Sequence, residues 1–445
     1  MFKKIIFGLF LLGLAIMINN AFYYPVNAGY DAALHLTYAK IISEELRLPT
    51  FIETRENYNP PLFYLISGLL IRFSSYVFGV DFFQAAKIWQ FINILLAFTS
   101  IYLWRQIIKQ IYSNNQNKNY HILLFPLALL SFPVWYKTIV MFSIEAWFLF
   151  TSSLYLWFFI IKFIPKPNFV NVIILSLILI INLLTKINAF TLLAVTIIGL
   201  LGLVLIKKIN VKKAIVYLLI VIVLVLSGSG WFYIGRRNQG IYGVGEGGEP
   251  DIPLLKRQSI SFYTDIPFTL MMTYPMRQNQ PLNKLIPIFY SEFWGDFWNY
   301  FPQRRYGLPV AEVRKNREVS NSQRIASLVL QNKINLLPTF LMVFGLIVLI
   351  YRLIRNFIYR KQWLIQVLLL IFFMINWCGF IFMLTKFPSW KGDSIKASYM
   401  LSLMPIFAYL LVIGLETVRS VKYLLTPLYI WLLINVIVNL SFSWF

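Results

Sequence analysis

The chain has 445 residues, of which 59% are apolar and 13% are charged, and its mean hydropathy is +0.69. Soluble domains are about half apolar and a quarter charged, so this composition indicates an integral membrane protein. The formal net charge of +23 would suit a nucleic-acid partner, but many basic residues stand in short junctions between apolar runs. Short loops rich in Lys and Arg mark the cytoplasmic side of a membrane, which explains the charge without nucleic acid.

Apolar runs of about 20 residues recur along the chain, the length that a helix needs to cross the hydrocarbon core. We predict an all-α polytopic membrane protein with about eleven transmembrane helices. In chain order the predicted spans are 5–24, 82–104, 121–135, 140–161, 169–185, 188–206, 214–234, 338–358, 363–384, 399–417 and 423–442.

The apolar run at 61–79 is left out of this set because of the basic loops. If it crossed, the basic stretch at 105–118 and the basic loops after it would lie outside. As a re-entrant or interfacial helix on the outer side, it leaves every short basic junction inside. The N-terminus is then cytoplasmic and the C-terminus outside, in what we expect to be a bacterial inner or plasma membrane. No A-x-A-like cleavage site follows the first run, which predicts an uncleaved anchor.

Two long segments are expected on the outer side. The first, 25–81, belongs to a transmembrane catalytic module at 1–234. The second, 235–337, begins with the glycine-rich IYGVGEGGEPDIP, which predicts a loop. It continues through IPIFYSEFWGDFWNYF, whose aromatic content predicts a small external element on the membrane surface. Residues 338–445 would form the C-terminal transmembrane helices.

The first outer segment contains GYDAALHLTYAK, in which His35 follows Asp31 by four residues. On a helix beginning near Gly29 these two side chains share one face. Asp31 is either a helix N-cap or first-turn carboxylate, or a general base that acts on an acceptor hydroxyl or amine beside the membrane. His35 is either a hydrogen-bonded packing residue or a participant in that chemistry. In the catalytic interpretation the second substrate lies in the bilayer and is a lipid.

Further ionisable residues fall at the same predicted surface. Glu145 lies about one turn inside the outer end of its span, as a functional group or as one half of a salt bridge with a neighbouring helix. Lys186 stands in a tight turn between two spans, where it either snorkels or neutralises a phosphate. The last outer loop, SWKGDSIKASYML, carries residues that are ordinary loop groups or contacts for a phosphate at headgroup depth: Lys391, Asp393, Lys396 and Tyr399.

Other chemistries find no support in the sequence. His35 and His121 fall on opposite sides of the predicted topology, and with the single cysteine, Cys378, they form no zinc site of usual spacing. No P-loop is present, and GVGEGG does not follow a strand, so it is no dinucleotide-binding motif. We therefore assign no metal ligand and no certain cofactor, and a divalent metal has no supporting ligand set.

Several short motifs in a fixed order resemble membrane glycosyltransferases of the GT-C class. They are a basic start, one span, Gly-Tyr-Asp with His four residues after the Asp, and Pro-Pro-Leu-x-Tyr before an apolar stretch. The pattern is most similar to the branch of protein O-mannosyltransferases and lipid A aminoarabinose transferases. LLTKINAF is similar to the Thr-Lys turn of that branch, and GDSIKASYMLSLMPIFAYLL to its Lys-x-x-Tyr-Leu-Leu-x-x-x-Pro ending. FSIEAWFLF stands where relatives carry an acidic residue opening a span, so the resemblance covers the full length.

The resemblance implies a sugar donor on a polyprenyl phosphate or diphosphate, such as an undecaprenyl lipid, and a glycan, glycolipid or protein acceptor. It also implies an inverting displacement on the outer face. Asp31 would accept the proton of the acceptor, and His35 would orient or assist it. Lys186 and Lys396 would stabilise the departing lipid phosphate. Glu145 would shape the cavity near the donor headgroup.

This sequence departs from the pattern at two positions. Relatives commonly carry a second acidic residue after the first Asp, where this chain has Ala32, and often His or Lys before the double proline, where it has Asn59. Asp31 is thus the only acidic candidate in its motif, and the phosphate role expected at Asn59 shifts toward the lysines. For Trp294, Trp298 and Tyr300 of the second outer segment, sugar stacking and interfacial anchoring are both open. The remaining candidates for donor or acceptor binding are Tyr30, Lys391, Asp393, Tyr399, Trp294 and Trp298.

Two other classes of protein stay open. A polysaccharide polymerase or O-antigen ligase also handles lipid-linked glycans, but would depend on arginines such as Arg304 and Arg305. A transporter or flippase would place ionisable groups near the bilayer midplane and show inverted repeats, which are not evident in the sequence. Neutralising Asp31 should abolish sugar transfer by a GT-C enzyme, weaken a polymerase and spare a transporter.

Overall fold

The computed structural model describes residues 2–113, 118–238, 252–275, 283–298, 322–355, 361–388, 394–418 and 425–445. All regular secondary structure in these ranges is helical, because a helix satisfies its own backbone hydrogen bonds in lipid. Within the same ranges, seven helices are long and apolar enough to cross a membrane, or eight if one bent pair is a single span. The prediction of an all-α polytopic membrane protein is confirmed.

The main helices follow the predicted spans in order. They are α1 (Phe2–Tyr23), α4 (Phe82–Ile111), α5 (Lys118–Leu130), α7 (Ile144–Trp157), α8 (Phe169–Leu183), α9 (Phe190–Leu205), α10 (Val211–Asn238), α16 (Leu336–Arg355), α17 (Lys361–Lys386), α18 (Met404–Val418) and α19 (Leu425–Ser441). A π-helical segment at Phe158–Phe163 continues α7. The apolar stretches of α1, α8 and α19 have only 10–17 residues. The total of about eleven crossings therefore stays a prediction, because it requires these shorter helices to span as well.

The third predicted span, 121–135, is not a straight helix. Helix α5 ends at Leu130, and α6 (Pro133–Ile139) continues at an angle of 65°. Pro133 stands at the start of α6, and Phe132 before it is extended, with ψ 113°. A residue before proline is disfavoured in the helical conformation, so the break follows from the sequence.

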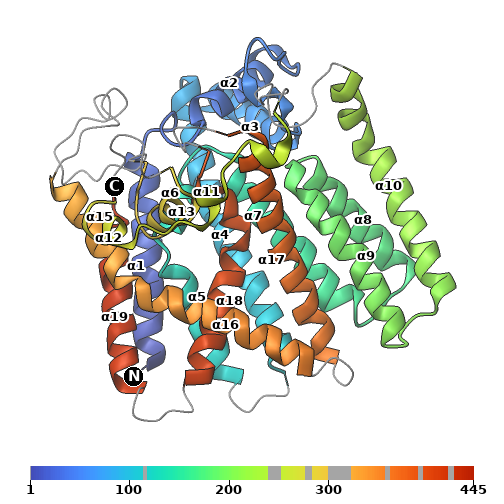
Figure 1. Cartoon of the computed structure of the whole chain (residues 1–445). Helices are drawn as coiled ribbons and strands as arrows, with labels where there is room; N and C mark the ends of the chain where they lie inside the picture. Colours follow the sequence, from blue (N-terminus) through green and yellow to red (C-terminus); the bar gives the residue numbers. More distant parts are fainter. Residues whose placement is uncertain are drawn as a thin grey trace.

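Helices α2 (Ala32–Glu45) and α3 (Leu62–Phe78) lie together at one end of the bundle, joined through the short 3-10 helix η1 (Arg55–Tyr58) (Figure 1). The two helices pack closely, since a Cβ added at Gly68 of α3 would lie 2.8 Å from the carbonyl oxygen of Ala39. We call this end of the bundle the α2 end. That the apolar run at 61–79 is a re-entrant or interfacial helix on the outer side of the membrane stays a prediction.

The start of α1 and the basic junctions within the described residues lie at the opposite end of the bundle. Figure 1 places the start of α1 and the connection between α9 and α10 there, while the C-terminus lies toward the α2 end. In that connection, Lys208 Nζ donates to the carbonyl oxygen of Ile164 at 2.7 Å. At the ends of α16 and α18, Arg352 pairs with Glu416 at 3.0 Å. Basic side chains at helix C-termini also meet the carbonyl oxygens that the helix leaves unpaired.

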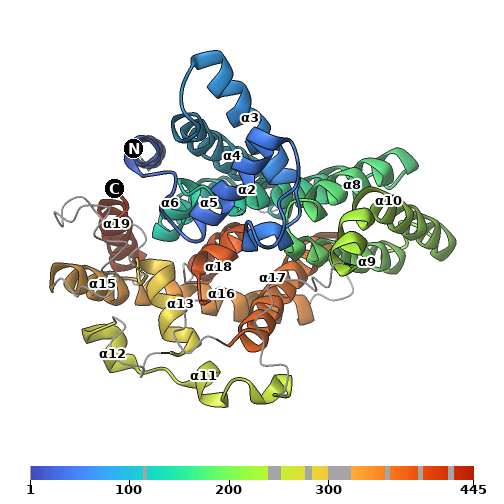
Figure 2. The ribbon, with the colours of Figure 1, turned by 90° about the horizontal axis from the view of Figure 1, so that it is seen from above.

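The predicted outer segment 235–337 starts inside α10 and ends inside α16. Its described parts form α11 (Ile260–Thr264), α12 (Phe268–Thr273), α13 (Leu285–Trp294) and α15 (Ser322–Ile334). Seen from above, α11 to α13 run along one side of the bundle, away from α3 (Figure 2). The side chains of α13 are mostly buried, so this part of the segment packs on the bundle.

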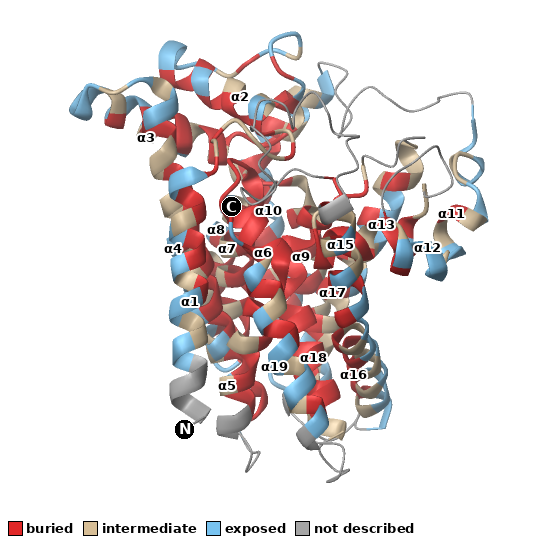
Figure 3. Ribbon diagram, turned by 90° about the vertical axis from the view of Figure 1, so that its left-hand side faces the viewer, coloured by how far each residue is buried: buried red, intermediate tan, exposed pale blue. Residues whose placement is uncertain are grey.

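Buried residues follow the axis of the bundle, and the outer faces of the helices are exposed (Figure 3). Between the charged ends of α10 most exposed side chains are apolar, with Val216, Val223 and Leu226 each more than half exposed. A helix that presents apolar side chains outward along most of its length is suited to contact with lipid rather than with water.

Helices α16 and α18 touch through two glycines. A Cβ added at Gly345 would overlap the backbone carbonyl oxygen of Leu410, and one added at Gly414 would overlap that of Leu341. Small residues at such crossings let membrane helices approach closely.

Gly345→Ala is therefore expected to lower the free energy of unfolding by about 1–3 kcal/mol, because the methyl group forces the two helix backbones apart. Gly379→Ala in α17 is the matched control, since a Cβ there meets nothing within 4 Å. That control is expected to be neutral or slightly stabilising, because alanine favours a helix. Thermal unfolding in detergent micelles measures both, and equal midpoints for the two variants would contradict the account.

Candidate active site at the α2 end

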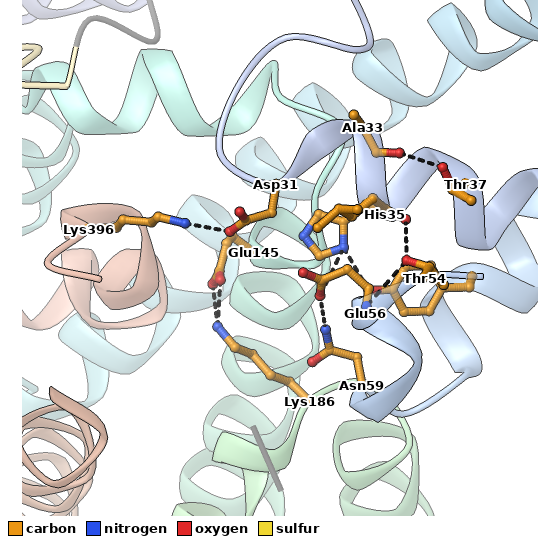
Figure 4. Close-up of polar contacts among 12 residues, drawn as sticks. Asp31, Ala33, His35, Thr37, Thr54, Glu56, Asn59, Glu145, Lys186 and Lys396 are labelled. Carbon is orange, nitrogen blue, oxygen red and sulfur yellow. Dashed lines mark hydrogen bonds and ion pairs between the residues drawn. The ribbon is translucent and has the colours of Figure 1, made fainter. Parts of the chain in front are cut away.

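Residues from distant parts of the sequence meet at the α2 end: Asp31, Glu145, Lys186 and Lys396. They stand before α2, in the first turn of α7, after α8, and before the 3-10 helix η6 (Ala397–Leu403) that leads into α18. Figure 4 shows their side chains turned toward one another. The sequence predicted that each would lie at one surface, and the structure joins them in two ion pairs.

Asp31 stands immediately before α2, but its side chain does not cap that helix. Its φ of 52° is left-handed, a conformation that aspartate adopts more often than most residues. Carboxylate Oδ2 instead lies 2.5 Å from Nζ of Lys396, whose side chain is 8% exposed. The N-cap interpretation of the Asp31 side chain is therefore wrong, and α2 begins at Ala32 rather than near Gly29.

The turn that carries Asp31 depends on Gly29. Its φ of 112° lies in a region that side-chain-bearing residues rarely adopt. A Cβ there would also lie 2.9 Å from the side chain of Met141, which belongs to the connection between α6 and α7. Glycine thus lets the chain pass close to that connection and brings Asp31 over the end of the bundle.

Glu145 and Lys186 form a buried ion pair. Nζ of Lys186 lies 2.6 Å from Oε1 and 2.7 Å from Oε2 of the carboxylate, and both side chains are 8% exposed. The expected alternative for Glu145, a salt bridge with a basic residue of a neighbouring helix, is what the structure contains. The partner in this salt bridge is Lys186, which is itself the candidate for binding a phosphate. The salt bridge and the proposed functional roles therefore involve the same two residues.

The turn around Lys186 is tied to three other parts of the protein. The backbone N–H of Leu62 donates to the carbonyl oxygen of Leu184 at 2.9 Å, directly after the double proline. Trp147 Nε1 donates to the Thr185 hydroxyl at 3.1 Å, and the Tyr233 hydroxyl donates to the carbonyl oxygen of Leu183 at 2.7 Å. The double-proline segment and the Thr-Lys turn, which the sequence identified separately, are therefore in direct contact.

Tyr399 lies between the two lysines. Nζ of Lys186 and Nζ of Lys396 are each 5.4 Å from the centre of the Tyr399 ring, and Lys396 is also 5.6 Å from the centre of the Tyr30 ring. Cations within about 6 Å of an aromatic ring are attracted to its face. Both ammonium groups also pair with a carboxylate, Lys186 with Glu145 and Lys396 with Asp31.

His35 does not hydrogen-bond to Asp31 through its side chain. Its Nδ1 shares a hydrogen bond with the Tyr64 hydroxyl at 2.7 Å, and Glu56 Oε2 lies 3.6 Å away. Burial lowers the pKa of His35 from 6.5 to about 4. The negative charge of Asp31 raises this pKa, and the positive charges of Lys396 and Lys186 lower it further. His35 is therefore a neutral imidazole at physiological pH.

Glu56 lies in the same cluster, although it is not among the residues predicted from the sequence. It is 5% exposed and accepts a hydrogen bond from Nδ2 of Asn59. Burial, followed by the negative charge of Asp31, raises the pKa of Glu56 from 4.5 to about 8. Because Asn59 is occupied by this carboxyl group, the structure does not support a phosphate contact at Asn59. The signal for Glu56 was its place just before the double proline, in RENYNPP.

Glu56→Gln is expected to gain stability relative to the wild type as the pH rises from about 4.5 to 8. In this window the unfolded carboxyl group is ionised and the folded one is protonated, so folding takes up a proton. The free energy of unfolding of the wild type then falls by up to about 1.4 kcal/mol per pH unit, until the pH exceeds the folded pKa. Glutamine copies the protonated acid and lacks this loss.

Thermal unfolding of both proteins in the same micelles at pH 5 and pH 8 measures the effect. His35 has the opposite pH dependence: its lowered pKa reduces the free energy of unfolding as the pH falls from 6.5 toward 4. Both proteins contain His35, so this effect is common to them. Parallel pH dependence in the two proteins would contradict the protonated state of Glu56.

Trp294 and Trp298 are not exposed platforms. Trp294 is 1% exposed, packs against Phe132 and Phe293, and donates from Nε1 to the Thr339 hydroxyl at 2.8 Å. Trp298 is 9% exposed. A sugar cannot stack on a ring that the protein covers on its faces, so the stacking role expected for these residues is wrong for this conformation.

Some predicted residues lie outside the part of the chain that the structure describes. These are Lys391 and Asp393 of the last loop, the stacking candidate Tyr300, and the arginines of the alternative interpretation, Arg304 and Arg305. Among the described residues, no group of three or more His, Cys, Asp or Glu side chains is arranged to hold a metal ion.

The fold is similar to that of a solved oligosaccharyltransferase from Archaeoglobus fulgidus in its apo form, with a TM-score of 0.51. The fold is GT-C-like. The two sequences are 11% identical, and the match covers 99% of this chain and 56% of the archaeal protein, so this chain spans about half the length of that relative. No protein-family model matches the sequence, and no curated protein matches it.

Proposed function

We propose that the protein is an integral-membrane glycosyltransferase that moves a sugar from a polyprenyl-phosphate donor to a glycan, glycolipid or protein acceptor. The observation that carries the proposal is the pair of lysines over the Tyr399 ring, one of them joined to the carboxylate of Asp31. One carboxylate and two ammonium groups supply the base and the phosphate-stabilising charge that the transfer needs. The GT-C-like fold and the resemblance of the sequence motifs support the same class of enzyme.

In the proposed reaction, an oxygen or nitrogen of the acceptor attacks C1 of the sugar, and its proton passes to Asp31. The bond between C1 and the phosphate oxygen breaks, and the polyprenyl phosphate leaves with the bonding electron pair. Attack from the side opposite the phosphate inverts the anomeric configuration. Lys186 and Lys396 neutralise the negative charge that develops on the departing phosphate.

The other members of the cluster orient these groups. Glu145 holds the ammonium group of Lys186 through two short contacts, which fixes the direction of that side chain. His35 stands one turn after Asp31, and its hydrogen bond with Tyr64 fixes the ring. As a neutral imidazole it can accept or donate a hydrogen bond to the acceptor without adding charge.

We place the reaction on the outer side of the membrane. The basic junctions and the N-terminus gather at the end opposite to the cluster (Figure 1), and the positive-inside rule favours that end as the cytoplasmic one. A donor whose lipid tail stays in the bilayer would present its phosphate at headgroup depth, and we propose that the two lysines meet it there. A transporter would instead need its ionisable groups near the midplane.

The test is an assay with membranes that contain the protein and a pool of polyprenyl-linked donors carrying labelled sugar. We expect the label to leave the lipid and appear on an acceptor. A polymerase would give a ladder of products that grows by repeat units. A flippase would change the leaflet of the labelled lipid without breaking its bond to the sugar, and that result would overturn the proposal.

A further inference from the structure

The indole of Trp298 holds the backbone beside Lys396. Nε1 of Trp298 donates to the carbonyl oxygen of Ile395 at 2.9 Å, and Ile395 is fully buried. The next residue is Lys396, whose Nζ lies 2.5 Å from the carboxylate of Asp31. One hydrogen bond thus ties the segment after α13 to Ile395, the residue directly before the partner of the proposed base.

Buried charges fix the position of Trp298. Its backbone N–H donates to Oε2 of Glu292 at 3.2 Å, while Oε1 of Glu292 lies 3.3 Å from Nζ of Lys137 on α6. Lys137 also donates to the carbonyl oxygens of Glu292 and Gly295. Glu292 and Lys137 are 0% and 3% exposed, so removing either side chain would deprive buried polar atoms of the other of this contact. This pair fastens the end of α13 to α6.

We propose that Trp298 is a positioning residue that holds Lys396 against Asp31, with the Lys137–Glu292 pair as its anchor. The proposal deepens the glycosyltransferase function and rests on it. It gives the segment after α13 a role at the phosphate site in place of sugar stacking. Without the indole N–H, the Ile395 carbonyl oxygen loses this donor, and the backbone that leads into Lys396 loses one of the hydrogen bonds that hold it.

Trp294, the last residue of α13, provides a matched control four residues before Trp298. Its indole also donates one buried hydrogen bond, but to Thr339 of α16 and not to the backbone beside Lys396. Trp294→Phe and Trp298→Phe remove the same atoms from two buried sites. A merely structural contribution predicts similar effects for both variants, whereas positioning of Lys396 predicts a difference at the phosphate site.

The first readout is the reactivity of the lysines toward an amine-acylating reagent, followed by mass spectrometry. We expect Trp298→Phe to raise the labelling rate of Lys396 about three- to tenfold relative to Lys186, the range that one buried hydrogen bond supports. Trp294→Phe should leave the ratio unchanged. This readout needs no sugar transfer, so it tests the positioning even if the proposed function is wrong.

The second readout is the steady-state rate of sugar transfer. Trp298→Phe should raise KM for the lipid-linked donor several-fold more than Trp294→Phe does. If the wild type transfers no sugar, the proposed function fails and the labelling ratio alone decides on the positioning. If the wild type transfers sugar and the two variants match each other in both readouts, the inference is overturned.

Should Trp298→Phe not fold, 3-benzothienylalanine at position 298 replaces it in the same measurements. This residue keeps the size and shape of the ring system and removes only the N–H donor. A raised Lys396 labelling ratio supports the proposal, and a ratio equal to that of the wild type contradicts it.

Discussion

Asp31→Asn is expected to lower kcat/KM for sugar transfer by about 100- to 10,000-fold, the usual contribution of a positioned general base. Asparagine keeps the size of the side chain and its ability to hydrogen-bond, but it cannot take up the proton of the acceptor. The Asp31 side chain does not cap α2, so the loss cannot be ascribed to a weakened helix end. Donor binding, measured with a fluorescent polyprenyl phosphate, should persist because both lysines remain.

Asp81→Asn is the control for this variant. Asp81 caps α4, where its Oδ1 accepts a hydrogen bond from the backbone N–H of Gln84 at 2.9 Å. Asparagine caps helices about as well as aspartate, so transfer should continue at the wild-type rate. If Asp31→Asn and Asp81→Asn transferred sugar equally fast, Asp31 would not be the base.

Lys186→Met is expected to cost about 3–5 kcal/mol of stability, because it leaves the carboxylate of Glu145 buried without its partner. The double variant Lys186→Met/Glu145→Gln removes both charges and should recover most of that loss. Sugar transfer should stay about 100- to 1,000-fold low in both variants, because the departing phosphate has lost one of its two cations.

Recovery of stability without recovery of transfer separates the two roles of Lys186. Thermal unfolding and initial rates, measured on the same preparations, give the comparison. If the double variant regained both stability and transfer, Lys186 would serve the fold alone, and the phosphate role would fall to Lys396.

The sequence was sufficient for the class of fold, because long apolar runs and basic junctions reflect direct costs of burying charge and backbone in lipid. It also predicted that Glu145 and Lys186 lie at one surface. It could not predict their pairing, because Glu145 lies in α7 and Lys186 in the turn after α8, and the contact depends on how α7 and α8 pack. The break between α5 and α6 was readable from Pro133 but was not predicted.

For Trp294, Trp298, Glu56 and Asn59, the environment of the side chain depends on tertiary packing, which the local sequence does not show. Trp294 and Trp298 stand in an aromatic-rich segment that looks alike whether its rings face a ligand, a membrane or the protein core. Glu56 was missed because a carboxylate in a polar loop carries no periodic signal, and its raised pKa comes from tertiary burial. Asn59 was judged from its place in a motif, although Glu56, three residues earlier, occupies its side chain.

The most direct test of the central claim uses the purified protein in liposomes with a polyprenyl-phosphate donor that carries labels on both sugar and lipid. The wild type is predicted to release one polyprenyl phosphate for each sugar that appears on the acceptor, and Asp31→Asn to release almost none. Release at the same rate by both proteins, or movement of the intact donor between leaflets without release, would contradict a glycosyltransferase in which Asp31 is the base.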